Sequence, residues 1–443
     1  MSGLIGLAAQ SLSVFARGGG GGSGSGGGGG SILIAVGYVP MHALGAVFRR
    51  KDKVKLGNWV TWPTAVVFGI LLMAIFRGYG FVMAIGAMMG AGAGLYGWLS
   101  KLKRNKKAEE ALQAAGASDA AWDETKIKEY VTTVFNRFQY DWSRFDTASI
   151  QKYTTPEYFQ HISLMLLAIK QASRVNQMTD VQITMQDIQS VTDGQAKTQD
   201  EFIMGIQAKA TDTLIDTRDN AQLYVDKSEF TEFWHFKRAA GDGWLLAGIR
   251  QATESQMMLQ QSVEQFARQQ NFYYSPDWGW LLLPRKGQIF SSGKFGTSDI
   301  NNHCIGLYNN VLVQIYTYLP NPQKLTNQYL VAQVQLPKSY GDIVVRRKKF
   351  GQWGGKSGLQ EVKTEWTDFN KKFEVLASTA EGPTSLELLH PVFMEFLEKQ
   401  PFEINLEVTD NVVYFYANEN GVKPEHYPVM LAVMQEAFKQ MKM

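Results

Sequence analysis

The hydrophobic pattern divides the chain into an apolar N-terminal part and a soluble remainder. Three apolar stretches, residues 32–48, 59–76 and 81–99, lie within the first hundred residues, and the last two contain no charged residue. A helix that crosses a bilayer takes roughly 17–25 such residues. We therefore predict membrane segments across residues 32–99, the first being weakened as a span by Pro40 and His42.

The third apolar stretch carries Gly86, Gly90 and Gly94 at four-residue spacing. Small residues on one helix face allow a second helix to approach closely. The expected partner is the second stretch, which only a short turn at residues 77–80 separates from it. Association of two copies of the chain through the same face is the alternative.

Residues 1–31 are expected to form a flexible N-terminus, because residues 18–30 contain only Gly and Ser. The mildly apolar stretch before them, residues 1–16, has no Lys or Arg. It therefore lacks the positive region of a secretory signal and is read as a short interfacial helix, with a cleaved signal as the alternative.

Basic residues cluster beside the apolar stretches and set the expected orientation: Arg49, Arg50, Lys51, Lys101, Lys103, Arg104, Lys106 and Lys107. Because Lys and Arg concentrate on the cytoplasmic side of membrane proteins, everything after Lys107 is expected in the cytoplasm. The same residues could contact anionic lipid head groups.

After a basic and helical linker at residues 100–120, the pattern changes to that of an α+β domain at residues 121–253. Apolar residues at helical spacing predict a helix over 123–142, and Thr155-Pro156-Glu157 is typical of a second helix start. Extended runs at 181–191, 200–212, 221–238 and 244–251 predict an antiparallel sheet. Helices followed by a curved sheet leave a concave, partly apolar pocket.

The stretch from Phe230 to Gln251 supplies the candidate binding residues Glu232, Trp234, Phe236, Arg238 and Trp244. Strand alternation places the first four on one face. Both faces of this run carry aromatic residues, as for a central strand covered on both sides. These side chains are either part of the core or contacts to a ligand or partner, and the pattern leaves both readings open.

The residues FTEFWHFKR, followed by GWLLAGIRQ and preceded by TPEYF, resemble the Tim44-like domain. That family includes a mitochondrial import-motor subunit and bacterial membrane proteins with Gly/Ser-rich N-termini. The resemblance implies a cone-shaped fold of the nuclear-transport-factor-two type, a tethering or binding role at a membrane, and no catalytic residues. The chaperone-recruiting part of the mitochondrial protein has no counterpart in this sequence.

A helical connector at residues 254–276 and a second α+β domain at 277–443 are predicted to follow. The segments FNKKFEVLAS, LLHPVFMEFLEKQ and VVYFYAN resemble a bacterial family of unknown function. Within this domain a basic run, Arg346 to Lys349, precedes Phe350 and Trp353. Such a run binds nucleic acid or lipid, or forms a solvated loop at the end of a hairpin.

Composition and motifs give little sign of catalysis. Net charge is +3, Cys304 is the only cysteine, and the six histidines are not spaced as local ligand pairs. We therefore predict no metal, cofactor, catalytic residue or nucleic-acid partner. Residues of the type needed for acid–base chemistry in a pocket, such as His161, Asp187 and Asp200, are present, but nothing distinguishes them.

These observations predict a non-enzymatic adaptor that passes several times through the bacterial inner membrane and has cytoplasmic C-terminal domains. Its partners would be the lipid bilayer and a protein, peptide or anionic lipid, in protein transport or the assembly of membrane complexes. An enzyme with isomerase- or dehydratase-like chemistry is one alternative, and a surface module for anionic lipid is another.

Overall fold

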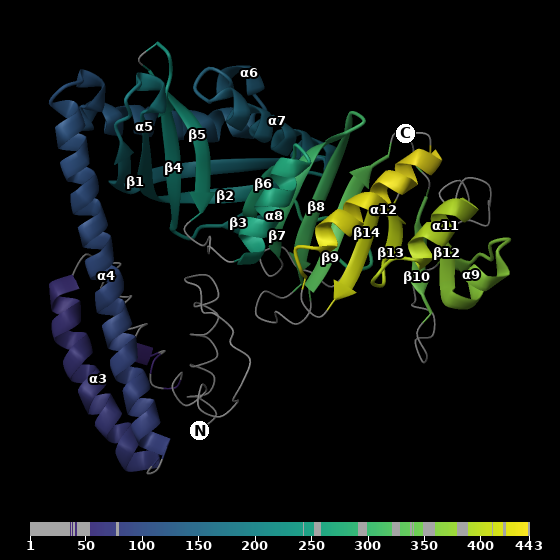
Figure 1. Cartoon of the computed structure of the whole chain (residues 1–443), viewed down its shortest axis with the longest axis horizontal. Coiled ribbons are helices and arrows are strands. Elements are labelled where there is room, and N and C mark those ends of the chain that lie inside the picture. Colours follow the sequence, from purple (N-terminus) through teal and green to yellow (C-terminus); the bar gives the residue numbers. More distant parts are fainter. Residues whose placement is uncertain are drawn as a thin grey trace. The chain divides into compact units, whose positions relative to one another are not determined.

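The structure is a computed structural model of the chain (Figure 1). It describes residues 54–76, 79–241, 243–251, 258–290, 299–320, 328–336, 341–348, 359–378, 389–409, 411–419 and 422–441, together with residues 36, 38, 40, 41 and 339. Several predictions concern residues outside the described part: those for residues 1–31, for most of 32–48, and for Arg49, Arg50 and Lys51.

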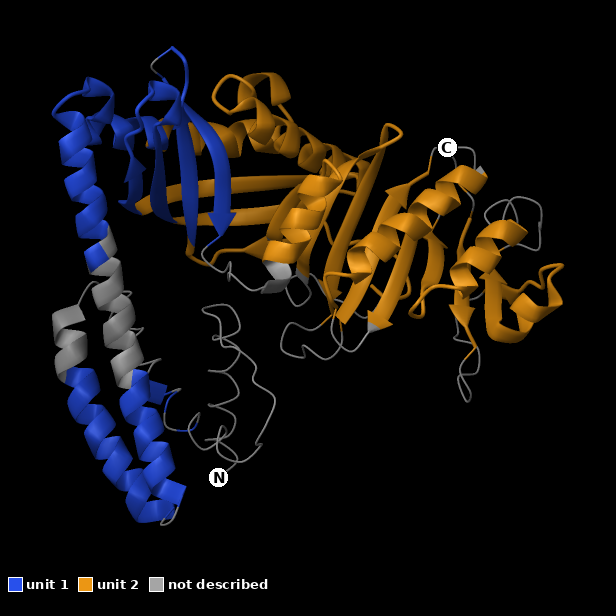
Figure 2. Ribbon diagram, viewed as in Figure 1, with its two compact units in different colours: residues 1–131, 185–207, 231–253 blue, residues 132–184, 208–230, 254–443 orange. Residues whose placement is uncertain are grey.

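The chain divides into two compact units (Figure 2). Unit 1 comprises residues 1–131, 185–207 and 231–253, and unit 2 comprises residues 132–184, 208–230 and 254–443. The long strands β1, Arg174–Thr192, and β2, Glu201–Asp216, each contribute residues to both units.

Two helices form an antiparallel hairpin in unit 1: α3, Val54–Phe76, and α4, Gly80–Gly116 (Figure 1). Ala65 of α3, Ala87 of α4 and Met41 are buried together. Among the described residues, no helix has both the length and the apolar character required to cross a membrane. The stretches predicted as spans at 59–76 and 81–99 are thus helical, but crossing is not supported for them.

The C-terminal turns of α4 pack against the domain that follows. Ala108, Leu112 and Ala115 are buried at helical spacing, and α4 contacts the short 3-10 helix η2, Ala120–Trp122. Asp119 caps η2 by accepting a hydrogen bond from the backbone of Ala121 at 2.9 Å. The residues predicted as a linker therefore continue α4 without a break to Gly116.

The predicted helices of the middle domain are present as α5, Glu124–Ser143, and α7, Pro156–Gln171, with the short α6, Thr147–Ile150, between them. The Asp146 and Thr155 side chains accept backbone hydrogen bonds at the starts of α6 and α7. Pro156 occupies the first turn of α7, where its missing N–H has no helical partner to lose.

A five-stranded sheet follows, completed by β3, Ala221–Asp226, β4, Phe230–Arg238, and β5, Trp244–Gln251; the 3-10 helix η3, Lys197–Gln199, lies between β1 and β2. The strand order is β1-β2-β4-β5, with β3 also paired to β2. The single run predicted at 221–238 is two strands, and β1 begins seven residues before the predicted 181. The α+β order of helices followed by an antiparallel sheet is confirmed.

The C-terminal region forms a second, nine-stranded sheet of order β11-β12-β10-β13-β14-β9-β8-β7-β6. Its strands are β6, Tyr273–Gly279; β7, Asp299–Tyr308; β8, Val311–Leu319; β9, Gln328–Gln335; β10, Ile343–Arg347; β11, Gln360–Glu361; β12, Phe373–Ala377; β13, Asn405–Thr409; and β14, Val412–Glu419.

Helices cover one face of this sheet: α8, Met258–Gln269, α11, Pro391–Glu398, and α12, His426–Met441, while the short α9, Thr367–Lys372, precedes β12 (Figure 1). Val263 of α8 and Met430 of α12 join Ile315, Phe415 and the fully buried Cys304 in the main core. The stretch predicted as a helical connector therefore contributes to the core of this domain.

Candidate functional site

The candidate residues on β4 and β5 lie in an aromatic core within unit 1. Trp234 and Phe236 are fully buried, and Trp244 is 7% exposed. Phe236 stacks on Phe202 of β2 with ring centroids 4.9 Å apart, and Trp244 meets Trp122 of η2 edge to face at 4.7 Å. Such pairs stabilise a fold beyond the area they bury.

Arg238 lies at the end of β4 between two carboxylates. Its guanidinium donates to Asp119 at 2.5 Å and to Asp200 at 2.9 Å, and its side chain is only 1% exposed. It also lies 5.9 Å from the centre of the Trp244 ring. The hydrogen bond from Arg238, aided by that from Ala121, lowers the pKa of Asp119 to about 2.

Glu232 accepts hydrogen bonds from Trp234 Nε1 at 2.9 Å and from Gln251 Nε2 at 2.8 Å. Burial raises the pKa of Glu232, and these two bonds oppose that shift. The predicted alternation is therefore present, since Glu232, Trp234 and Phe236 are joined along one face of β4. The contacts of all five candidate residues described above are internal to the domain.

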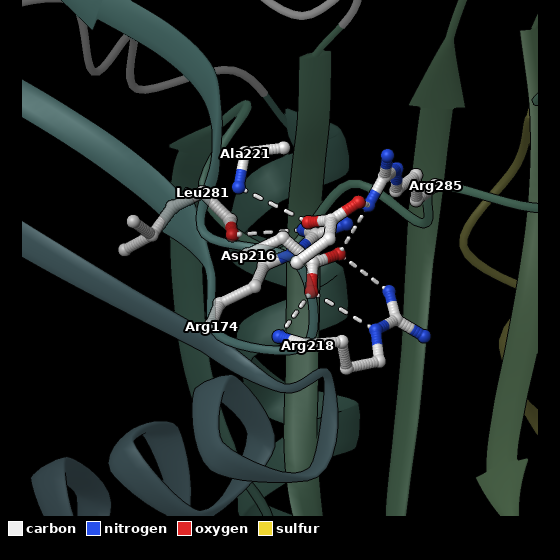
Figure 3. A network of polar contacts seen from close by, with 7 residues as sticks. Arg174, Asp216, Arg218, Ala221, Leu281 and Arg285 are labelled. Atoms are coloured by element: carbon white, nitrogen blue, oxygen red, sulfur yellow. Dashed lines mark hydrogen bonds and ion pairs between the residues drawn. The ribbon is translucent and has the colours of Figure 1, made fainter.

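A second polar network lies in unit 2 around Asp216, at the end of β2 (Figure 3). The fully buried Asp216 carboxylate accepts from Arg218 Nε at 2.9 Å and from Arg285 at 2.8 Å. Arg285 also donates to Asp219 at 2.8 Å, and the buried Arg174 donates to the carbonyl of Leu281 at 3.3 Å. Hydrogen bonds from Arg218 hold the pKa of Asp216 well below its usual range.

This network joins residues that the sequence pattern assigned to separate domains. Asp216 and Arg174 belong to the first sheet, while Leu281 and Arg285 follow β6 of the second. Trp280 adds a ring contact to Tyr224 of β3, with centroids 4.8 Å apart. Unit 2 is thus one body that contains parts of both predicted domains.

Two histidines are held by uncharged partners in unit 2. His161 shares a hydrogen bond of 3.1 Å with Ser275 and stacks on Tyr273, 5.2 Å away. His303 donates from Nε2 to Gln314 Oε1 at 3.0 Å, while its buried Nδ1 has no partner among the described residues. Burial lowers the pKa of His161 to about 3 and that of His303 to about 4, so both are neutral near pH 7.

A bulge in β7 accounts for the position of His303. The register with β8 shifts between Asn301 and Cys304, and Asn302 has a φ of +50°. Asn302 is fixed there because its side chain accepts from Tyr274 and its carbonyl accepts from Tyr427. The bulge is a local device that redirects a side chain, and the sequence pattern does not show it.

Most of the exposed large apolar side chains among the described residues lie on the hairpin of α3 and α4. Its exposed large side chains are Val66, Val67, Ile70, Leu71, Met73, Ile75, Phe76, Phe81, Ile85, Met88 and Met89. Six residues with only apolar side chains line a hollow of about 440 Å³ near the turn: Met73, Phe81, Ala84, Ile85, Met88 and Met89.

The predicted glycine face is partly described. Gly86 and Gly90 are buried, and a Cβ at Gly90 would collide with the backbone of Tyr38. Position 90 thus faces the first apolar segment, while the second stretch packs against α4 at other positions, such as Gly69 against Ala84. Gly94 belongs to α4, and nothing further is described for it.

The basic residues after the hairpin are surface residues where they are described. Lys103, Lys106 and Lys107 are exposed, and Lys106 lies 3.7 Å from Glu110. Lys101 and Arg104 belong to α4, and their side chains lie outside the described part.

The basic run of the second domain is ion-paired. Arg346 pairs with Glu374 at 2.8 Å, Lys348 lies 3.6 Å from Glu361, and Arg347 donates to the carbonyl of Glu398. Arg346 and Arg347 lie within β10, between β12 and β13, so the reading of a solvated hairpin end does not hold for these two residues. Lys349, Phe350 and Trp353 lie outside the described residues.

Four residues with structural roles were not predicted from the sequence: Asp119, Asp216, Arg285 and Glu407. Each has a partner more than sixty positions away, which no local spacing reveals. A local signal existed only for Asp119, at an N-cap position before Ala120-Ala121-Trp122, and for Asp216, which lies two positions before its other partner Arg218. Within the described part of the chain, no group of three or more His, Cys, Asp or Glu side chains could hold a metal ion.

Comparison with known proteins gives one family match, and no curated protein matches. Among solved structures, the mycobacterial trehalose monomycolate transport factor A, TtfA, is 12% identical over 41% of this chain and 96% of its own, with a TM-score of 0.33. The intermembrane space region of the chloroplast protein ARC6 is 11% identical over 29% of this chain and 96% of its own, with a TM-score of 0.24.

The family match is to the Tim44-like domain and covers residues 108–251. It starts at Ala108, the first of the three buried residues in the last turns of α4, and it ends at Gln251, the last residue of β5. The matched third of the chain thus includes the helices, the first sheet and the Arg238 network. Residues 108–251 form a Tim44-like domain.

Proposed function

We propose that the chain is a non-enzymatic tethering protein of the bacterial inner membrane. The hairpin of α3 and α4 inserts into lipid, and the Tim44-like domain binds a protein, peptide or lipid close to the membrane surface. Protein transport or the assembly of membrane complexes is the process in which such a tether would act.

The observation that supports membrane insertion is the distribution of exposed apolar residues on α3. Val66, Val67, Ile70, Leu71 and Ile75 are 46%, 57%, 56%, 51% and 66% exposed. At 100° per residue these positions cover one half of the helix, and the buried apolar residues Ala65 and Leu72 lie on the other half, so α3 is apolar all round. A soluble helix buries one apolar stripe, whereas a helix that is apolar on all sides belongs in lipid or in a large core.

Association of two copies through the glycine face is the competing role for the hairpin. A dimer would require Gly90 to be open to a second helix. Position 90 is covered by the backbone of Tyr38 from the same chain. The glycine spacing therefore favours packing within one chain.

Continuity of α4 supports the tethering role. The helix runs from the apolar hairpin past Lys103, Lys106 and Lys107 to the buried turns that begin the Tim44-like domain. Exposed lysines at this position suit anionic head groups and a cytoplasmic location for the domain. In this proposal the domain that contacts the partner is stabilised by its buried interior residues, which include Glu232, Trp234, Phe236, Arg238 and Trp244.

Flotation of the full chain with liposomes tests the insertion. Val67→Glu with Leu71→Glu places two charges on the hairpin, and we expect it to move the protein from the floating to the soluble fraction. Leu307→Glu with Val392→Glu is the matched control, because these residues are 51% and 49% exposed outside the hairpin. Equal flotation of both double variants would remove the basis for insertion.

The tethering role needs a second measurement. A photoreactive amino acid at Tyr140, which is 61% exposed on α5, should crosslink a specific protein or lipid in intact cells. Trapping of neither, at this position and at other exposed positions of the Tim44-like domain, would contradict the role while leaving the membrane insertion standing.

A further inference from the structure

Residues 280–290, which follow β6, form a strap between the two sheets of unit 2. One end lies on the first sheet, where Trp280 meets Tyr224 and Arg285 bonds Asp216 and Asp219. The other end lies on the second sheet, where Phe290 packs on Tyr318 of β8 at 4.7 Å and on Tyr414 of β14 at 5.2 Å. The strap thus covers tyrosines on the sheet face opposite α8 and α12.

The end of the strap at Phe290 is attached to Glu407 of β13. Both oxygens of its carboxyl group lie within hydrogen-bond distance of the backbone N–H of Gln288, at 2.7 and 2.8 Å, and in the neutral form the carbonyl oxygen is the acceptor. Gly287 has a φ of +127°, and a Cβ at this position would lie 2.8 Å from the Phe290 ring. The turn therefore requires glycine and brings Gln288 and Phe290 to the sheet together.

Glu407 is a buried carboxylate that lacks a cation partner. It is 4% exposed, and it forms no ion pair among the described residues. Its cross-strand neighbour is Tyr414. A buried charge without a counterion carries a large desolvation cost, which opening to water removes.

The other titratable groups around this site leave that cost uncompensated. The negative charge of Asp342 raises the pKa of Glu407, as burial does. The charges of Arg174 and Arg218 lower the pKa of Tyr414, and the charge of Arg346 lowers the pKa of Tyr416. Burial raises the pKa of Glu407 to about 7, while the Gln288 N–H opposes the shift.

We propose that Glu407 is a proton-dependent latch: its neutral carboxyl holds the strap on the second sheet, and its ionised form releases Gly287–Phe290 and uncovers Tyr318 and Tyr414. Once the strap is released, the Glu407 carboxyl is solvated and has an ordinary pKa. Because the closed form has the raised pKa, closure is favoured most below pH 4.5 and weakens as pH rises to 7. The latch responds to mild acidification by closing.

Hydrogen exchange of the full chain in detergent, measured at pH 5 and pH 8 and corrected for intrinsic rates, tests the latch. For the wild type we expect protection of the amides of residues 287–290 to fall on the order of fifty-fold between pH 5 and pH 8. Glu407→Gln retains an acceptor for Gln288 and should stay protected at both pH values. Glu374→Gln in the same sheet is the control, and it should behave like the wild type.

Two results would overturn the proposal: unchanged wild-type protection across this range, or a pH dependence that persists in Glu407→Gln. Gly287→Ala provides an independent check, because it disturbs the turn and leaves the carboxyl at position 407 in place. This variant should show low protection of residues 287–290 at both pH values, and strong protection in it would contradict the proposed role of the turn.

Discussion

Arg238 donates a hydrogen bond of 2.9 Å to Asp200, and both side chains are almost completely buried, at 1% and 3% exposed. The same guanidinium bonds Asp119, which caps η2 and is 28% exposed at its side chain. The start of the Tim44-like domain is thereby fixed to the end of β4. The pair has a structural role, which can be measured.

Replacement of Arg238 by Met should lower the free energy of unfolding by about 3–5 kcal/mol, because it leaves the buried Asp200 carboxylate without its counterion. Urea denaturation followed by tryptophan fluorescence would measure the loss. Asp200→Asn should destabilise the domain more than Asp119→Asn, since Asp119 is reached by solvent. The reverse order would show that Asp119 contributes more to stability than Asp200.

The Asp216 network predicts a second destabilised variant. Asp216→Asn removes a fully buried carboxylate from between Arg218 and Arg285, whose side chains are 50% and 37% exposed. Because the two arginines remain open to solvent, we expect a loss of about 1.5–3 kcal/mol, as for hydrogen bonds to charged groups. Asp219→Asn is the matched control, because Asp219 bonds the same Arg285 but is 47% exposed, and its effect should be clearly smaller. Equal effects on the urea midpoint would argue that burial of Asp216 contributes nothing.

His303 predicts a loss of stability in acid. Its folded pKa of about 4 is below the unfolded value of about 6.5, so the unfolded chain binds the extra proton between these values. Its contribution to stability is complete above pH 6.5 and should fall by about 2 kcal/mol by pH 5. The contribution of Glu407 to stability changes in the opposite direction over this range. The wild type must therefore be compared with His303→Gln. Identical changes in both proteins between pH 7.5 and pH 5 would contradict the assignment.

Gly90→Ala should loosen the packing of the first apolar segment on α4, because the added Cβ meets the backbone of Tyr38. Overpacking of this kind costs about 1–3 kcal/mol. The melting temperature of the detergent-solubilised chain should drop. Gly248→Ala in β5 is the control, because its added Cβ has open space around it, and it should melt like the wild type. An unchanged melting temperature in Gly90→Ala would contradict the close approach of Tyr38 to Gly90.

Local patterns predicted the local elements well. Alternation in Phe230 to Arg238 identified an interior strand, and Thr155 with Pro156 marked the start of α7. These features succeed because caps and strand faces depend on residues only a few positions apart. The split of the run 221–238 into β3 and β4 was missed, since its polar residues 227–229 resemble the exposed positions of a strand.

The candidate site was predicted less completely, because its interactions join distant residues. Arg238 was selected as a contact residue, and its partners Asp119 and Asp200 lie 119 and 38 positions away. Arg285 and Asp216 are 69 positions apart, across a boundary expected between two domains. No periodicity links such pairs, so the connection between the two sheets of unit 2 becomes visible only when the chain is folded.

Cys304 has a practical consequence for all of these experiments. The residue is fully buried in the second domain, and burial raises the pKa of its thiol well above the usual range. Because the thiolate is the reactive form, maleimide reagents should not modify Cys304 in the folded chain. A cysteine introduced on the surface would then be the one labelled position. Spin labels and fluorophores can therefore be attached without first replacing the native cysteine.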